Sequence, residues 1–288
     1  MKRIIFLTIF SLVSTVIYSQ LSGSGTFSDP WSGTLAGDMT WSGTKYINGD
    51  ITVDDETLTI SPGATIIFLA EDADLIITGT GKLIASGTAE SIITFTADDD
   101  NDGNYGETGE RWGHIWFNLP SESYASVIEY CIIEYGDVHN FTDYRGYGGA
   151  IHANFSNLTV SHCILRNNYA YWGGAIFVNK NKSISIKNCY IFNNKSSRGG
   201  GGVYCWDWSA TLVENCLFES NACLELSNNN YSGGGLCSQT SAPVKVINST
   251  FVNNTTKRPT GAGIELYGAS AAKVINCIFW GSNNQILL

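Results

Sequence analysis

A short motif recurs five times in the second half of the chain, and its spacing restricts the possible folds more than any other feature. Each copy is a glycine-rich turn that closes on Ile, Val or Leu. The copies are Gly148–Ile151, Gly173–Ile176, Gly200–Val203, Gly233–Leu236 and Gly261–Ile264. The closing residue is followed 12 or 13 positions later by Cys or Ser, whereas successive Cys or Ser positions lie 26 to 33 residues apart. A constant inner spacing with a variable outer one is typical of repeat arrays whose loops accept insertions.

Apolar residues alternate with polar ones inside each copy. Leu158 and Val160 precede Cys163, for example, and Leu165 follows it. This period of two predicts strands, and the Gly, Asn and Ser between the segments are turn formers. A unit of about 27 residues with two or three short strands cannot bury its own apolar face. Stacked units can, because each strand then pairs in parallel with its equivalent about 4.8 Å away.

The repeat marks resemble those of a known group of proteins. The Gly-Gly-Ala-Ile turns and the Phe-x-x-Asn segments Phe218–Asn221 and Phe251–Asn254 are similar to repeats of polymorphic outer-membrane proteins, within the pectate-lyase-like superfamily of right-handed parallel β-helices. The resemblance covers about residues 50–288 and implies a surface-exposed location. It says little about activity, since this fold hosts lyases, hydrolases, adhesins and inert spacers. We therefore predict an all-β, single-stranded right-handed parallel β-helix solenoid over 50–288, clearest in 148–288.

Two columns of equivalent residues are expected to stack along this solenoid. The cysteine column consists of Cys131, Cys163, Cys189, Cys216 and Cys277, with Ser249 in the remaining place. The asparagine column consists of Asn188, Asn215, Asn248 and Asn276. Asn tolerates the left-handed dihedrals of a tight turn, and its amide can bond to the Asn above.

Stacked cysteines would lie about 4.8 Å apart, whereas a disulfide needs Cβ atoms about 3.8 Å apart. We therefore favour buried free thiols that pack as small apolar side chains. Disulfides are the alternative for an exported chain. Cys205 and Cys237, at similar places after their glycine turns, are candidate exceptions, and Cys223 has no evident mate.

The first 49 residues differ from the rest. Residues 1–19 combine Met1–Arg3 with a fifteen-residue apolar run, which is typical of a cleaved signal peptide; a membrane anchor is the alternative. Residues 20–49 predict an irregular lead-in and cap, in which Trp31 and Trp41 pack on the first coil. We expect a secreted, extracellular or outer-membrane-surface protein with no membrane span after signal removal. At the other end, Leu288 follows a repeat without a closing cap, which suggests that the natural protein continues.

Charge is distributed unevenly. The chain carries a net charge of −10, with 14 acids and one base in residues 50–110 but 6 acids and 11 bases from residue 139 onward. Because no concentrated basic face is present, we do not expect a nucleic-acid partner. Asp98, Asp100 and Asp102, followed by Gly103, match the first half of a calcium loop, although Gly109 stands where the pattern requires Glu. Calcium is thus a candidate cofactor, and a solvated acidic loop is the alternative.

No catalytic motif stands out. A lyase could combine Arg166 or Arg198 with Glu214 or Glu219, but these residues form no pattern. The stronger signal is aromatic. The candidate glycan-binding residues are Tyr171, Trp172, Tyr204, Trp206 and Trp208, of which the last three share one strand face by period two. Alternatively, some of them point into the coil.

We therefore predict a non-catalytic, adhesin-like binding module for polysaccharides or other cell-surface components. A polysaccharide lyase, or another glycan-active β-helix enzyme, is the first alternative. A structural stalk of a longer surface protein is the second alternative.

Overall fold

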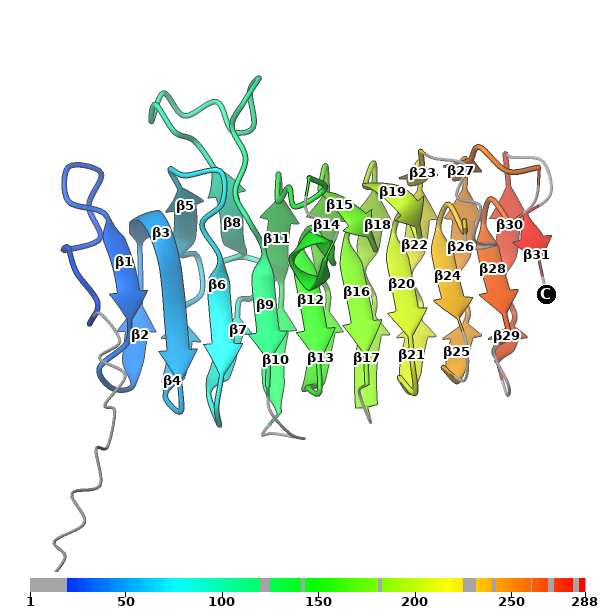
Figure 1. Ribbon diagram of the computed structural model, residues 1–288, viewed down its shortest axis with the longest axis horizontal. Coiled ribbons are helices and arrows are strands. Elements are labelled where there is room, and N and C mark those ends of the chain that lie inside the picture. Colours follow the sequence, from blue (N-terminus) through cyan, green and yellow to red (C-terminus); the bar gives the residue numbers. More distant parts are fainter. Residues whose placement is uncertain are drawn as a thin grey trace, which may run out of the picture.

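The computed structural model describes residues 20–119, 125–140, 143–180, 183–224, 232–239, 242–259, 261–268, 272–281 and 285–287. In these residues the only helical element is a 3₁₀ turn, η1 (Tyr144–Gly146), and everything else regular is β-strand. The strands form an elongated stack of coils, with each coil beside the next along the axis (Figure 1). The described part contains no helix long and apolar enough to cross a membrane. The predicted signal peptide, residues 1–19, lies outside the described residues.

Three parallel sheets run the length of the stack, and we call them faces A, B and C. Face A consists of β1 (Trp31–Thr34), the second part of β3 (Thr44–Asp54), β6 (Leu75–Thr78), β9 (Ile115–Asn118), β12 (Ile151–Asn154), β16 (Ile176–Asn179), β20 (Val203–Trp206), β24 (Leu236–Gln239), β28 (Ile264–Tyr267) and β31 (Ile286–Leu287). Face B consists of β2 (Met39–Trp41), β4 (Thr57–Ile60), β7 (Lys82–Ser86), β10 (Ser126–Glu129), β13 (Asn157–Ser161), β17 (Ser183–Lys187), β21 (Thr211–Glu214), β25 (Val244–Ile247) and β29 (Lys273–Ile275).

Face C consists of the first part of β3, β5 (Thr65–Phe68), β8 (Ile93–Ala97), β11 (Cys131–Glu134), β14 (Ile164–Arg166), β18 (Tyr190–Phe192), β22 (Leu217–Glu219), β26 (Thr250–Val252) and β30 (Ile278–Trp280). A short fourth sheet covers the corner between faces C and A. It consists of β15 (Tyr169–Trp172), β19 (Lys195–Gly199), β23 (Ala222–Cys223) and β27 (Thr255–Thr256). The prediction of an all-β parallel β-helix is confirmed.

The core lies inside the coils and follows the alternation seen in the sequence. In β16, Ile176 and Val178 point inward and are fully buried in the main core. Equivalent inward residues stack on one another along the axis. The rings of Phe218 and Phe251, in register on β22 and β26, lie 4.5 Å apart and nearly parallel. Each coil therefore buries its apolar side chains against the coils on either side, as the repeat required.

The asparagine column occupies the turn between faces B and C. Its four predicted members have φ between 49° and 55°, in the left-handed region. Their amides meet from coil to coil: Asn215 Nδ2 donates to Asn188 Oδ1 at 3.3 Å, and Asn276 Nδ2 donates to Asn248 Oδ1 at 2.7 Å. Asn188 Nδ2 lies 3.0 Å from Nε2 of His162, which stands one coil earlier and has φ of 54°. The side chains of this column are exposed to solvent.

A second column of asparagines, which includes the Asn of both Phe-x-x-Asn segments, is buried at the corner after face C. It consists of Asn168, Asn194, Asn221 and Asn254, each with no exposed surface. Asn194 Oδ1 accepts from the backbone N–H of Asn168 at 3.1 Å and from its Nδ2 at 2.9 Å. The same pattern continues to Asn221 and then to Asn254. These amides satisfy buried backbone groups that would otherwise lack partners.

The lead-in contains more regular structure than expected. Strands begin at Trp31, and β1 already pairs in parallel with β3. Trp41 is fully buried and Trp31 is 9% exposed, with their ring centroids 4.9 Å apart. The two tryptophans thus join the core of the first coils, and residues 31–49 belong to the stack rather than to an irregular cap.

All eight cysteines are unbridged. The five members of the cysteine column stand where face C begins, and each Sγ lies close to backbone carbonyls; Cys163 Sγ, for example, is 3.1 Å from Ser161 O. Cys205 and Cys237 do not occupy equivalent places, because the register of β20 and β24 pairs Cys205 with Ser238 and Tyr204 with Cys237. Cys205 therefore points into the core and Cys237 points outward, into a small covered cluster. Burial raises the pKa of Cys205 to about 12.

The buried thiols should be unreactive toward thiol reagents in the native protein. A thiolate is the reactive form, and burial in apolar surroundings opposes its formation. Seven cysteines are buried and Cys277 is half-buried, so a disulfide reagent such as DTNB should modify only Cys277 quickly. Denaturant should expose all eight thiols, and Cys277→Ala should abolish the fast reaction. Fast modification of several thiols in the native state would contradict a packed column.

Candidate ligand-binding groove

Two rows of side chains stand outward on face A. The first row is Trp116, His152, Phe177 and Tyr204, placed in register by the pairing of β9, β12, β16 and β20. The second row is Asn118, Asn154, Asn179 and Trp206, from the last position of the same four strands. Because alternate residues of a strand point to opposite sides, both rows follow from the inward packing of the residues between them.

A short segment around η1 covers part of these rows. Asp143 caps η1 by accepting from the backbone N–H of Arg145 at 3.0 Å. The same carboxylate pairs with the Arg145 guanidinium at 2.9 Å, and these hydrogen bonds lower the pKa of Asp143. Tyr144 lies 5.6 Å from Trp116 between ring centroids, and Tyr147 lies 4.5 Å from Phe177.

The rows and this segment enclose a cavity of about 520 Å³, which we call the aromatic groove. It is lined by Trp116, Asn118, Asp143, Tyr144, Tyr147, His152, Asn154, Asn179 and Trp206. Four aromatic rings and three carboxamides thus face one hollow. Apolar walls with a few convergent polar groups are typical of small-molecule sites.

Three buried polar atoms in the lining have no hydrogen-bond partner among the described residues. They are Trp116 Nε1, His152 Nδ1 and Asn179 Oδ1. His152 is 3% exposed, and burial, together with nearby His114, lowers its pKa well below the ordinary range. The imidazole is therefore neutral at physiological pH and offers one donor and one acceptor. Native structures rarely leave such atoms unpaired, so the presence of three of them in one hollow makes the groove a candidate ligand-binding site.

The structure separates the five aromatic residues predicted to bind glycans. Trp206 lines the groove. Tyr204 is 2% exposed and packs between Phe177 and Trp172, at 5.5 and 4.8 Å, so it supports the neighbouring rings. Tyr171 lies on β15, where its hydroxyl accepts from Arg198 Nε at 2.9 Å.

The expectation that Trp208 shares a face with Trp206 is wrong. Strand β20 ends at Trp206, and the next two residues have positive φ, 39° at Asp207 and 59° at Trp208. The period of two stops with the strand, and Trp208 projects into solvent with 72% of its surface exposed.

The groove residues that sequence analysis missed carried a detectable signal. Trp116 follows Ile115 as His152 follows Ile151, so the pattern around Trp112–Phe117 is an early copy of the repeat. Aligning it would have placed Trp116 and His152 in one row. Tyr144 and Tyr147, which cover the rows, lie between repeats, where the repeat pattern does not predict the direction of a side chain.

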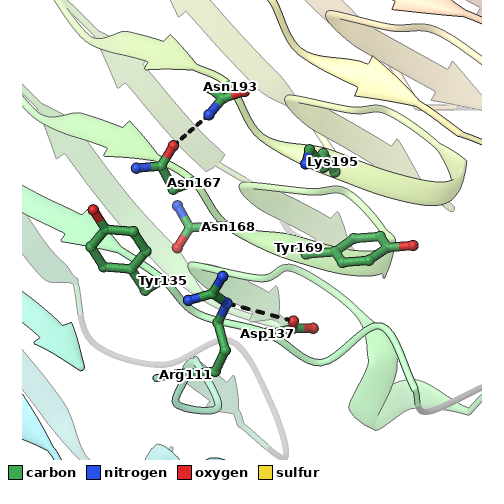
Figure 2. A pocket seen from close by; sticks show the side chains of 8 residues that line it. All are labelled: Arg111, Tyr135, Asp137, Asn167, Asn168, Tyr169, Asn193 and Lys195. Carbon is green, nitrogen blue, oxygen red and sulfur yellow. Dashed lines mark hydrogen bonds and ion pairs between the residues drawn. The ribbon is translucent and has the colours of Figure 1, made fainter. Parts of the chain in front are cut away.

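A second, polar hollow of about 320 Å³ lies at the corner between face C and the fourth sheet, and we call it the corner pocket. Figure 2 shows its lining: Arg111, Tyr135, Asp137, Asn167, Asn168, Tyr169, Asn193 and Lys195. Asn193 Nδ2 donates to Asn167 Oδ1 at 2.6 Å, so asparagine side chains of neighbouring coils are hydrogen-bonded here too.

The acidic loop brings the three predicted calcium ligands together. Oxygens of Asp98, Asp100 and Asp102 lie within 4.8 Å of one another. Asp98 is buried, and its carboxylate accepts from the backbone N–H groups of Asp102 and Gly103, both at 3.1 Å. These bonds also describe a self-contained loop, so calcium stays a prediction.

The four residues considered for a lyase do not form one site. Arg166 pairs with Glu134 at 2.6 Å on the outside of face C, and Arg198 contacts Tyr171 at the corner. Glu214 pairs with Lys187 at 3.3 Å on face B. Glu219 accepts a hydrogen bond from Tyr190 on face C.

Comparison with known proteins agrees with this architecture. Residues 111–218, which include every residue that lines the groove, match the family model described as a right handed beta helix region. Over 115 residues, 39% of this chain, the sequence is 30% identical to the metabotropic glutamate receptor-like protein R of Dictyostelium discoideum. The matched part is 7% of that protein's length, and no solved structure matches the chain. The narrower resemblance to polymorphic outer-membrane repeats stays a prediction. With its parallel strands stacked coil on coil, the chain is a parallel β-helix protein.

Proposed function

We propose that this protein is a secreted or cell-surface β-helix module that binds glycans in the aromatic groove without chemically altering them. The observation that carries the proposal is the placement of Trp116 and Trp206 around a row of three asparagine amides. A sugar ring has apolar C–H faces and a rim of hydroxyl groups. Aromatic side chains pack on such faces, and carboxamides can both donate to and accept from hydroxyls.

The proposed location has independent support. The basic start and apolar run of residues 1–19 have the pattern of a secretory signal. The name of the Dictyostelium protein describes that protein as receptor-like, which is compatible with a role at a surface, although only 7% of its length is matched.

The proposal of binding without catalysis follows from the titratable groups of the groove. Asp143 is the carboxylate among the lining residues, and its hydrogen bonds to Arg145 lower its pKa, so it is charged at neutral pH, cannot act as a general acid and is a weak general base. His152, held neutral by burial, has no carboxylate partner in the described structure to orient it as a base. Efficient general acid–base catalysis requires groups whose pKa lies near the working pH.

Substitution of Trp206 tests the groove. Trp206→Ala should weaken binding to the best glycan of a polysaccharide panel by at least about tenfold, since loss of a buried aromatic contact removes roughly 1.5–3 kcal/mol. Trp208→Ala is the matched control, because Trp208 is exposed and does not line the groove. Affinities would be measured by calorimetry on purified residues 20–288. An equal loss of affinity in both variants, or no loss in either, would show that the glycan does not bind in the aromatic groove.

The same panel tests for catalysis. We expect no new reducing or unsaturated ends, with calcium present or absent. Release from any polysaccharide would support the lyase alternative. If nothing binds and nothing is released, the structural stalk becomes the better explanation of the fold.

A further inference from the structure

We infer that the corner pocket is a second binding site, specific for an oxyanion such as a sulfate or a carboxylate. The site is separate from the aromatic groove and does not depend on its function. The pocket lies where the chain enters the regular repeat, between the loop that carries Arg111 and the first strands of the fourth sheet.

The repeat itself creates an unused donor at this point. In three of the coils that follow, two asparagines occupy the turn after face C, at Asn167-Asn168, Asn193-Asn194 and Asn253-Asn254, whereas the coil of β22 has Ser220-Asn221 there. In the preceding coil the turn is Tyr135-Gly136, and Tyr135 has the same left-handed φ, 62°, as the outer asparagines. Asn167 accepts from Asn193, but no amide precedes it to receive its own N–H groups. Within the described residues, Asn167 Nδ2 has no hydrogen-bond partner, and Asn167 is one of the residues that line the pocket, with its nitrogen on the side of Tyr135 in Figure 2.

Two cations flank this amide. Lys195 lies on β19, and its ammonium has neither a hydrogen bond nor an ion pair with any described residue. Arg111 is anchored through Nη1, which contacts the carbonyls of Gly106 and Glu107 at 3.3 and 3.4 Å. Figure 2 shows its guanidinium reaching toward Asn168, on the opposite side of the pocket from Lys195.

The one carboxylate of the lining is already compensated. Asp137 Oδ2 lies 3.9 Å from Arg111 Nε, and Asp137 Oδ1 contacts His139 Nδ1. His139 in turn stacks on Tyr169, with ring centroids 4.0 Å apart, which fixes the position of the carboxylate. The positive charge of Lys195 is thus left over, in a chain whose net charge is −10.

Lys195 is exposed and Asn167 is half-buried, so these donors face water, which an anionic ligand would replace. An ammonium, the rest of a guanidinium and a carboxamide N–H₂ together present donors to a hollow of about 320 Å³. Charge-assisted hydrogen bonds to sulfate or carboxylate oxygens are about twice as strong as neutral ones. The ring of Tyr135, with Arg111 5.6 Å from its centroid, gives the pocket one apolar wall. A free inorganic anion and an acidic group carried on a sugar share this chemistry.

A titration followed by NMR tests the site directly. The side-chain amides of Asn167 and Asn193 should shift on addition of sodium sulfate, and not on addition of sodium chloride at equal ionic strength. Lys195→Gln should weaken sulfate binding about tenfold. Lys245→Gln, which removes an exposed lysine on face B, should change it less than about twofold. Trp206→Ala should leave it unchanged, which separates this site from the groove.

A second arm distinguishes the source of the anion. Methyl glucuronide would be compared with methyl glucoside, which differs by having no carboxylate. Tighter binding of the glucuronide than of sulfate would indicate a sugar-borne anion, and binding of sulfate alone would indicate a free one; both support an oxyanion site. Equal shifts with methyl glucoside, no shift with either anion, or full retention of binding in Lys195→Gln would overturn it.

Discussion

Gly174→Ala is expected to lower the free energy of unfolding by about 3 kcal/mol or more. A Cβ at this position would overlap the backbone carbonyls of Gly201, in the next coil, and of Lys195, in the fourth sheet. Both are main-chain atoms, of the glycine turn before β20 and of strand β19, so neither can move without separating two coils. Overpacking typically costs about 1–3 kcal/mol when side chains can adjust, and backbone overlap allows less adjustment. Urea unfolding followed by circular dichroism would measure the loss.

Gly37→Ala is the control for that substitution. A Cβ on Gly37 meets nothing within 4 Å, and the residue does not have a left-handed φ. We expect no loss of stability and a gain of up to about 1 kcal/mol, because alanine restricts the unfolded chain. If the two variants were equally stable, the coils would not be packed as closely at the glycine turn as the structure has them.

These turns explain why the fold was predictable. Glycine occupies the second position in the first four copies of the motif, because each coil passes against the next there, and Ala262 occupies it in the fifth. The same contact sets the register. Once the register is set, a period of two decides which residues enter the core. Ile176 and Val178 could therefore be assigned inward from spacing alone, and the structure places both in the core.

The site was less predictable because it depends on departures from the repeat. The segment that carries Tyr144 and Tyr147 is an insertion, and its position over face A is decided by tertiary contacts with Trp116 and Phe177. The position of Trp208 was predicted wrongly because the repeat pattern was applied where it no longer holds. The period of two was extended beyond the end of β20, into two residues whose backbone is left-handed.

The cysteines show the same limit. The column around Cys163 follows the repeat and lies where spacing put it. Cys205 and Cys237 were compared by their distance from a glycine turn, but they differ by one residue in register and so point to opposite sides of face A. A difference of one residue is small in sequence and decisive in a strand.

Asn194→Ala is the second substitution with a large expected effect, about 3 kcal/mol. Asn194 Oδ1 accepts two hydrogen bonds from Asn168, and its Nδ2 donates to Leu165 O at 2.9 Å and to Asn221 Oδ1 at 3.0 Å. Alanine would leave these buried partners unsatisfied, and each such group costs roughly 1–3 kcal/mol. Water that enters the space left by the side chain would satisfy only some of these groups. The lower free energy of unfolding should therefore appear as a lower midpoint of urea unfolding.

Asn193→Gly provides a control one residue away. Asn193 belongs to the exposed outer pair with Asn167, and glycine keeps its left-handed φ of 54° while removing the amide. The expected loss is below about 1 kcal/mol, mostly from the added freedom of the unfolded chain. A similar loss for both variants would mean that the amides stabilise the turn through its backbone conformation alone. A loss confined to Asn194 would instead assign the stabilisation to buried hydrogen bonds between coils, which only a stack of equivalent coils can form.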